Sequence, residues 1–172
     1  MTPGISPRQM PDSTVFDYYL KAGTPIDISL LTHNDHLDLE DVVLSPNNNP
    51  WGSTNPEGIY VIDCAGQEIR IKKLRVLGTL CILNPGGISR IEDEVLIEPA
   101  ISNFPSLLVD GSIQIKFDSI TRLEEVDANL NPPGTPYQGE ENLDHKDSYP
   151  SIIRGLVYVS GRMDFVADEK VS

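Results

Sequence analysis

Acidic and amide side chains gather in the second half of the chain, where their oxygens could hold calcium. Asp127-Ala-Asn129-Leu-Asn131 matches the opening D-x-N-x-N of a helix–loop–helix calcium loop. The match ends there, because the sixth position is Pro132 instead of glycine and the twelfth is Gln138 instead of glutamate. We therefore reject this motif, with a solvated acidic loop as the favoured interpretation. Calcium held in another geometry would draw on the candidate ligands Asp127, Glu140, Glu141, Asp144 and Asp147.

Two histidines three residues apart are the candidate zinc ligands. His33-Asn-Asp-His36 carries Asp35 inside the motif and Asp38 just beyond it. Zinc sites need three or four ligands at about 2.0–2.3 Å. The only further histidine is His145, near the other end of the chain. A polar loop without metal is the favoured interpretation, and no cofactor is predicted.

The enzymatic alternative is a glycoside hydrolase or lyase, which would need two carboxylates about 5–9 Å apart. Carboxylates are plentiful, but no N-T-D, D-D or G-H-G pattern accompanies Arg70-Ile71-Lys72, the one triplet typical of pectinase-like chains. The chain has no G-x-S-x-G motif for a serine nucleophile. The sequence therefore favours a protein without catalytic residues.

Two cysteines, Cys64 and Cys81, both lie in apolar runs typical of strands. They are too few for a disulfide framework and lack metal-ligand spacing. Buried free thiols are the favoured interpretation, and one bridge between neighbouring strands is the alternative.

Charge excludes one class of partner. The 172 residues contain 26 acidic and 13 basic side chains, a formal net charge of -13. Nucleic-acid binding needs clustered cations, and the densest basic stretch is only Arg70, Lys72, Lys73 and Arg75. No apolar run approaches the roughly 20 residues of a membrane span. We expect neither nucleic-acid binding nor a transmembrane segment.

The elements that would position these residues begin with one short helix. Residues 1–11 contain three prolines and are expected to be irregular. Residues 13–22 predict a helix, capped by Asp12 or Ser13, with Val15, Tyr18 and Tyr19 forming an apolar stripe. Gly23 suits a left-handed residue after the last turn.

Strand signals dominate from Ile59 onward. Apolar residues alternate with charged ones, as in Ile69 and Ile71, and the run over 152–159 is β-branched. Residues 118–150 are long, polar and rich in proline and glycine, so a functional site is expected there first. The strand content of residues 26–44 is not determined by their pattern.

One apolar pattern, h-x-G-x-h-x-h, recurs around four glycines at intervals of 33, 44 and 6 residues. These glycines are Gly78, Gly111, Gly155 and Gly161. We expect their flanking aliphatic side chains to point into a common interior as successive rungs. The predicted fold is mainly β, a short right-handed β-helix or solenoid with an N-terminal helix, and a β-sandwich is the alternative. The unequal intervals count against the solenoid.

A single domain over residues 1–172 is predicted. Within it, residues 1–45 form a leader that carries the helix over 13–22, residues 56–166 form the β-solenoid core, and residues 118–150 form a long polar loop.

Several stretches resemble a group of uncharacterised bacterial envelope proteins. These stretches are Gly58-Ile-Tyr-Val-Ile-Asp-Cys64, Gly78-Thr-Leu80 with Asn84-Pro-Gly86, Glu98-Pro-Ala100 with Asn103-Phe-Pro105, Asn131-Pro-Pro-Gly-Thr-Pro-Tyr137 and Tyr149-Pro-Ser-Ile-Ile-Arg-Gly-Leu-Val-Tyr-Val-Ser-Gly161. The resemblance implies an exported β-solenoid domain tethered by a pilin-like N-terminal segment, a segment that we do not find here, and it implies no catalytic residues. From it we expect an extracellular or periplasmic structural or binding module of a cell-surface or pilus-like assembly, with envelope proteins or surface glycans as partners.

Overall fold

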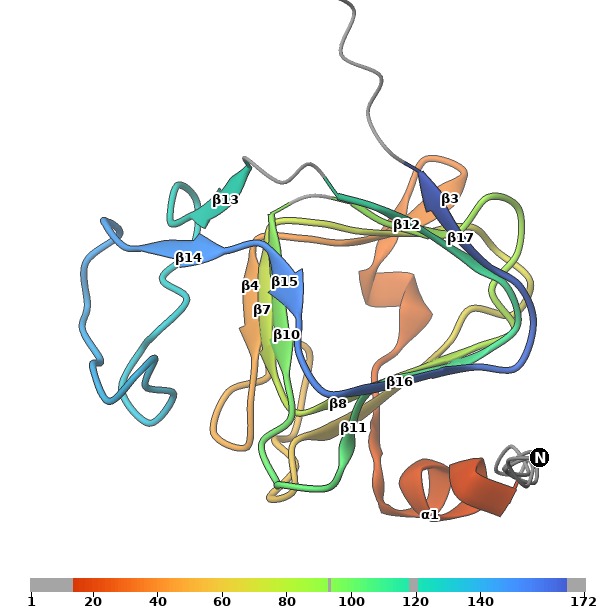
Figure 1. Cartoon of the computed structure of the whole chain (residues 1–172), viewed down its shortest axis with the longest axis horizontal. Coiled ribbons are helices and arrows are strands. Elements are labelled where there is room, and N and C mark those ends of the chain that lie inside the picture. The colour runs from red at the N-terminus through yellow and green to blue at the C-terminus, as the bar shows by residue number, and fades with distance from the viewer. Residues whose placement is uncertain (1–13, 93, 118–120, 167–172) are drawn as a thin grey trace, which may run out of the picture.

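The structure is a computed structural model that describes residues 14–92, 94–117 and 121–166 (Figure 1). The described residues form one α-helix, α1 (Thr14–Ala22), and one 3-10 helix, η1 (Ile28–Leu30), and the rest of the regular structure is β. The predicted irregular leader over 1–11 and the capping residues Asp12 and Ser13 lie outside the described residues.

The described strands fall into four sheets, none of which closes into a barrel. Sheet I contains, in spatial order, β1 (Thr24–Pro25), β5 (Ile59–Asp63), β8 (Thr79–Leu83), β11 (Pro105–Asp110) and β16 (Leu156–Val159). Sheet II contains β15 (Ile152–Ile153), β10 (Val95–Glu98), β7 (Leu74–Leu77) and β4 (Val42–Leu44). Sheet III contains β17 (Met163–Val166), β12 (Ile113–Lys116), β9 (Arg90–Ile91), β6 (Ile69–Ile71), β3 (His36–Leu39) and β2 (Thr32–His33). Sheet IV is the antiparallel pair β13 (Arg122–Glu124) and β14 (Ser148–Pro150).

The chain visits the three larger sheets in a fixed order. From β3 onward it passes from sheet III to sheet II to sheet I and back again, and it adds one strand to each sheet at every pass. Because each return enters a sheet in the same direction, all neighbouring strands of sheets I and II are parallel. Sheet III is parallel except for the antiparallel pair β2 and β3.

The four sheets correct the predicted fold. The alternative β-sandwich would have antiparallel sheets, whereas these are mostly parallel. The expected right-handed β-helix or solenoid is also not the observed class, because the strands divide over four separate open sheets and follow no single period. From β3 onward, successive strands of sheet III begin at residues 36, 69, 90, 113 and 163, which gives intervals of 33, 21, 23 and 50 residues.

The glycine pattern fails as a repeat for a physical reason. Each copy of the pattern crosses from one sheet to another instead of forming one rung. Gly78 and Gly155 lie between a strand of sheet II and a strand of sheet I, whereas Gly111 and Gly161 lie between sheet I and sheet III. The glycines therefore mark two kinds of corner, which explains their unequal intervals.

One apolar interior lies between the three larger sheets. Inward-facing aliphatic side chains from each sheet meet in it, for example Ile71 of sheet III, Val76 of sheet II and Leu80 of sheet I, all fully buried. Full burial of such a side chain contributes about 1.5–3 kcal/mol. The residues that flank Gly78 lie in this cluster, as expected, but Met163 and Phe165 after Gly161 are 39% and 72% exposed, so the expected common interior holds only in part.

The outer faces of the three sheets differ in what covers them. Helix α1 lies against sheet I (Figure 1), where Phe16 packs with Ile59 and Leu108. Residues 121–150 cover sheet II, where Leu123 and Tyr149 pack with strand residues of that sheet. The outer face of sheet III carries charged and polar side chains. The segment over sheet II holds the loop pocket described below, whereas no other described element covers the outer face of sheet III.

The predicted helix over 13–22 is observed as α1, but its buried stripe is different. Phe16 is buried with Tyr19 half-buried beside it, while Tyr18 is 49% exposed and donates to the carboxylate of Glu57 at 2.8 Å. Gly23 does not adopt the predicted left-handed conformation. An added Cβ there would lie 2.5 Å from Cγ2 of Val61, so this glycine permits close packing on sheet I.

Candidate functional site

Arg75 fixes the polar segment 125–147 to sheet II. It lies on β7 with 1% of its surface exposed. Its guanidinium donates to the carbonyl oxygens of Leu130 at 2.9 Å, Thr135 at 2.9 Å and Pro136 at 2.7 Å. Burial lowers the pKa of Arg75 from its usual value, and Glu98 opposes that shift. Sequence reasoning placed Arg75 in an ordinary basic stretch and missed this role.

Glu125 is the second buried charge that holds the segment. It is 4% exposed and accepts hydrogen bonds from the backbone N–H of Leu130 at 2.6 Å and the hydroxyl of Tyr149 at 2.7 Å. Burial, followed by the hydrogen bond to Glu125, raises the pKa of Tyr149 above its usual value. Within the predicted polar loop, residues 125–147 are therefore held by hydrogen bonds from Arg75 and to Glu125, two buried side chains that satisfy part of the segment's backbone.

This anchored segment encloses a polar pocket of about 280 Å³. Its lining consists of Asn131, Tyr137, Gln138, Glu140, Asp147, Ser148 and Tyr149. The rings of Tyr137 and Tyr149 pack edge to face with centroids 4.8 Å apart. Asn131 is 2% exposed, and its Oδ1 is buried without a hydrogen-bond partner among the described residues. A donor that reached this oxygen would remove a cost of about 1–3 kcal/mol. We call this hollow the loop pocket.

The five predicted calcium ligands are only partly brought together. Glu140 and Asp147 line the loop pocket. Asp127, Glu141 and Asp144 do not line it, and each is exposed. One oxygen of Asp147 already accepts two side-chain amide hydrogen bonds, at 2.9 and 2.6 Å. None of these five residues belongs to a group of three or more potential metal ligands found within the described part of the chain.

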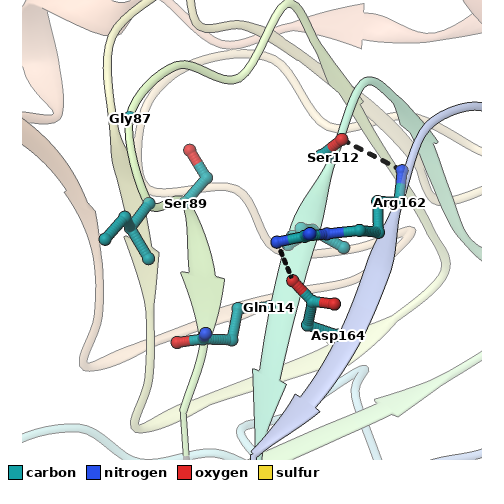
Figure 2. A pocket seen from close by; sticks show the side chains of 8 residues that line it. Gly87, Ser89, Ser112, Gln114, Arg162 and Asp164 are labelled. Atoms are coloured by element: carbon teal, nitrogen blue, oxygen red, sulfur yellow. Dashed lines mark hydrogen bonds and ion pairs between the residues drawn. The ribbon is translucent and has the colours of Figure 1, made fainter.

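A second hollow, of about 160 Å³, lies on the uncovered face of sheet III (Figure 2). It is lined by Gly87, Ile88, Ser89, Ser112, Ile113, Gln114, Arg162 and Asp164. In Figure 2 the Arg162 side chain extends across β12, and its guanidinium pairs with Asp164 at 2.6 Å. The backbone N–H of Arg162 donates to the hydroxyl of Ser112 at 3.0 Å. Because the Arg162 side chain is 79% exposed, this ion pair adds little stability.

Both cysteines are free and buried, which confirms the favoured interpretation. Burial raises the pKa of each thiol to about 12, and for Cys64 the neighbouring Asp63 adds to the shift. A thiol is nucleophilic only as the thiolate. Cys64 and Cys81 therefore do not supply a catalytic nucleophile near neutral pH.

We expect both thiols to be unreactive in the folded protein. At pH 8 the native chain should release almost no thionitrobenzoate from Ellman's reagent within minutes, because both groups are protonated and shielded. Addition of 6 M guanidinium chloride should then release about two equivalents per chain. Rapid modification of the native protein at either cysteine would contradict the buried placement.

No helix in the described residues is both long enough and apolar enough to cross a bilayer. The chain was also compared with protein-family models, with curated proteins and with solved structures, and none of the three comparisons gives a match.

Proposed function

We propose that this chain is a non-catalytic binding module that takes a glycan into the loop pocket. The observation that carries the proposal is the pocket itself, a fixed hollow with a half-buried tyrosine ring, amide and carboxylate groups and one unsatisfied acceptor on Asn131. Sugar hydroxyl groups both donate and accept hydrogen bonds, and the C–H faces of sugar rings pack on aromatic rings. A preformed hollow with few convergent polar groups is the usual form of a small-molecule site.

The charged groups around the pocket support binding over catalysis. Arg75 and Glu125 are used to hold the backbone of the segment, and one oxygen of Asp147 is used by two amides. The described hydrogen bonds of His33 and His36 go to carboxylates rather than to a serine or cysteine. The groups that could perform chemistry are thus largely engaged in supporting structure.

Binding should depend on the exposed amide of Gln138. We expect a neutral oligosaccharide selected from a glycan array to bind in isothermal titration calorimetry, and Gln138→Ala to weaken it about 3- to 10-fold, the effect of one lost hydrogen bond. The matched control is Gln114→Ala, which removes the same amide from the hollow of Figure 2 and should leave affinity unchanged. If no oligosaccharide binds, or if only the control loses affinity, the loop pocket is not the site.

A carbohydrate-active enzyme is the second candidate, favoured by one observation. Glu140 and Asp147 share the pocket with two tyrosines, and paired carboxylates are the machinery of glycoside hydrolysis. The distinguishing test is release of reducing ends from the bound oligosaccharide over one day. Release by the native chain but not by Glu140→Gln would replace the binding proposal with the enzymatic one.

We further propose that the module belongs to an exported cell-surface or pilus-like assembly. Support comes from the resemblance of the quoted stretches to envelope proteins and from the mainly β fold. The test is fractionation of the native host followed by protease treatment of whole cells. Recovery of the chain only in the cytosolic fraction would overturn this placement.

A further inference from the structure

The hairpin at the edge of sheet III places two histidines face to face. Strands β2 and β3 pair antiparallel, with His33 directly opposite His36. A two-residue turn joins them, and its Asn34 adopts the left-handed conformation at φ 55°. Directly opposed residues of an antiparallel pair project to the same face. Asp38 lies two residues after His36 on β3 and therefore shares that face.

These three side chains have the spacing of a metal site. Nδ1 of His33 lies 2.8 Å from Oδ2 of Asp38, and Nε2 of His36 lies 3.2 Å from Oδ1 of Asp38. One potential ligand atom from each residue lies within 4.8 Å of the others, and this is the one such group found in the described residues. Two imidazoles and a carboxylate are a ligand set that suits zinc and other late divalent ions rather than calcium.

The contacts of His36 leave two acceptors facing each other. Its Nδ1 lies 3.1 Å from the carboxylate of Asp35, and the tautomer of the neutral ring that carries its proton on Nδ1 donates to that carboxylate. In that tautomer the lone pair of Nε2 faces Oδ1 of Asp38, 3.2 Å away, an atom that is buried and has no hydrogen-bond partner among the described residues. A cation between the two atoms would bind both. A carboxylate on the outer nitrogen of a ligating histidine is also the usual support of zinc sites.

Nearby cations are already paired with other acids. Arg70 is the register partner of Asp38 on β6, but its Nε donates to Glu68 at 2.8 Å. Lys72 pairs with Glu40 at 3.0 Å. Neither side chain donates a hydrogen bond to Asp38, which leaves its Oδ1 available to a metal.

We propose that His33, His36 and Asp38 bind one zinc ion. Asp35 orients His36, and the side chain of His33, which is 66% exposed, leaves a fourth coordination position open to solvent. The ion would link β2 to β3. Because β2 pairs with no described strand other than β3, zinc would stabilise the edge of sheet III. The inference is independent of the proposed glycan function.

The test titrates the tag-free, metal-free full chain with zinc chloride. We expect about one equivalent of zinc in calorimetry, a thermal midpoint that rises with zinc concentration, and visible absorption bands of tetrahedral cobalt when cobalt(II) replaces zinc. Calcium should produce none of these effects. Absence of zinc binding, or a stoichiometry well above one without saturation, would overturn the proposal.

Substitutions of single residues test whether zinc binds at this cluster. His33→Gln changes an exposed side chain, so the fold should survive, and zinc affinity should fall at least 10-fold. Asp35→Asn keeps all three ligands and should weaken zinc about 10- to 100-fold, the usual effect of losing an outer carboxylate. The control His145→Gln removes an exposed histidine from the segment 125–147 and should bind as the native chain does. Native affinity in both His33→Gln and Asp35→Asn, or loss only in the control, would place zinc elsewhere and contradict the assignment.

Discussion

Replacement of Arg75 by alanine should lower the free energy of unfolding by about 3–5 kcal/mol, the cost of removing one member of a buried charged network. The guanidinium is the donor for three carbonyl oxygens of the segment 125–147, and the alanine variant removes this donor from all three, two of them in buried contacts. The change also opens a space beneath Tyr137, whose ring lies 5.4 Å from the guanidinium carbon. Both effects act at one position, so the loss should exceed that of an ordinary surface substitution.

Chemical denaturation with circular dichroism measures this loss, and limited proteolysis shows where it acts. We expect new cleavage sites within residues 125–147 before the sheets unfold. Arg75→Met should also be destabilising, because it restores volume but no donor. The matched control is Arg122→Ala, an exposed arginine that bonds Ser148 at 2.6 Å and should cost less than about 1 kcal/mol. Equal stability of Arg75→Ala and Arg122→Ala would show that the buried contacts do not hold the segment.

The mainly β character and the helix could be predicted because their signals are local. Ile69 and Ile71 alternate with charged neighbours, and they are fully buried on β6 as that alternation implies. The class of fold could not be predicted in the same way. A pattern that spans a glycine looks identical whether the chain continues in one sheet or turns into the next, and only the packing of distant strands decides between them.

The sequence predicts where the loop pocket lies, but not the contacts that hold its segment in place. Proline, glycine and polar residues between 118 and 150 indicated an irregular segment, and the structure places a pocket there. The contacts of its Arg75 anchor join residues 55 to 61 positions apart, such as Arg75 with Leu130 and Pro136. No local pattern identifies such a pair, because the residues next to an arginine in the sequence do not show whether its side chain will be buried or exposed.

The histidine cluster, in contrast, has a local signal in the sequence. Asn34-Asp35 is a plausible two-residue turn between short runs, and a hairpin at that position makes His33 and His36 cross-strand partners. The mixed apolar and charged pattern of residues 26–44 does not by itself assign these strands, so the pairing is not evident from that pattern. The nearest third ligand was Asp38 on the same strand face, not the distant His145.

Substitution of a glycine at a corner between two sheets should cause the second large loss of stability. Gly78 lies between β7 and β8, and a Cβ added there would collide with the carbonyl of Gly58 in the neighbouring pass of the chain. That carbonyl cannot easily withdraw, because it accepts the N–H of Thr79 at 2.9 Å. Gly78→Ala should therefore force the two passes apart and lower the free energy of unfolding by about 3 kcal/mol, the upper part of the range for overpacking.

The size of that loss separates a collision from the general effect of replacing glycine. Gly139→Ala is the control, because an added Cβ at Gly139 meets no atom within 4 Å, although its φ of +90° disfavours a side chain. Its cost should be about 1 kcal/mol, from backbone conformation alone. Urea unfolding curves of both variants, with unchanged slopes, give the comparison. If Gly78→Ala costs no more than Gly139→Ala, the corner has room for a methyl group and the close stacking of successive passes is wrong. A difference of about 2 kcal/mol between them would instead mean that glycine is required at this corner by the approach of a neighbouring strand, which single-sequence patterns cannot show.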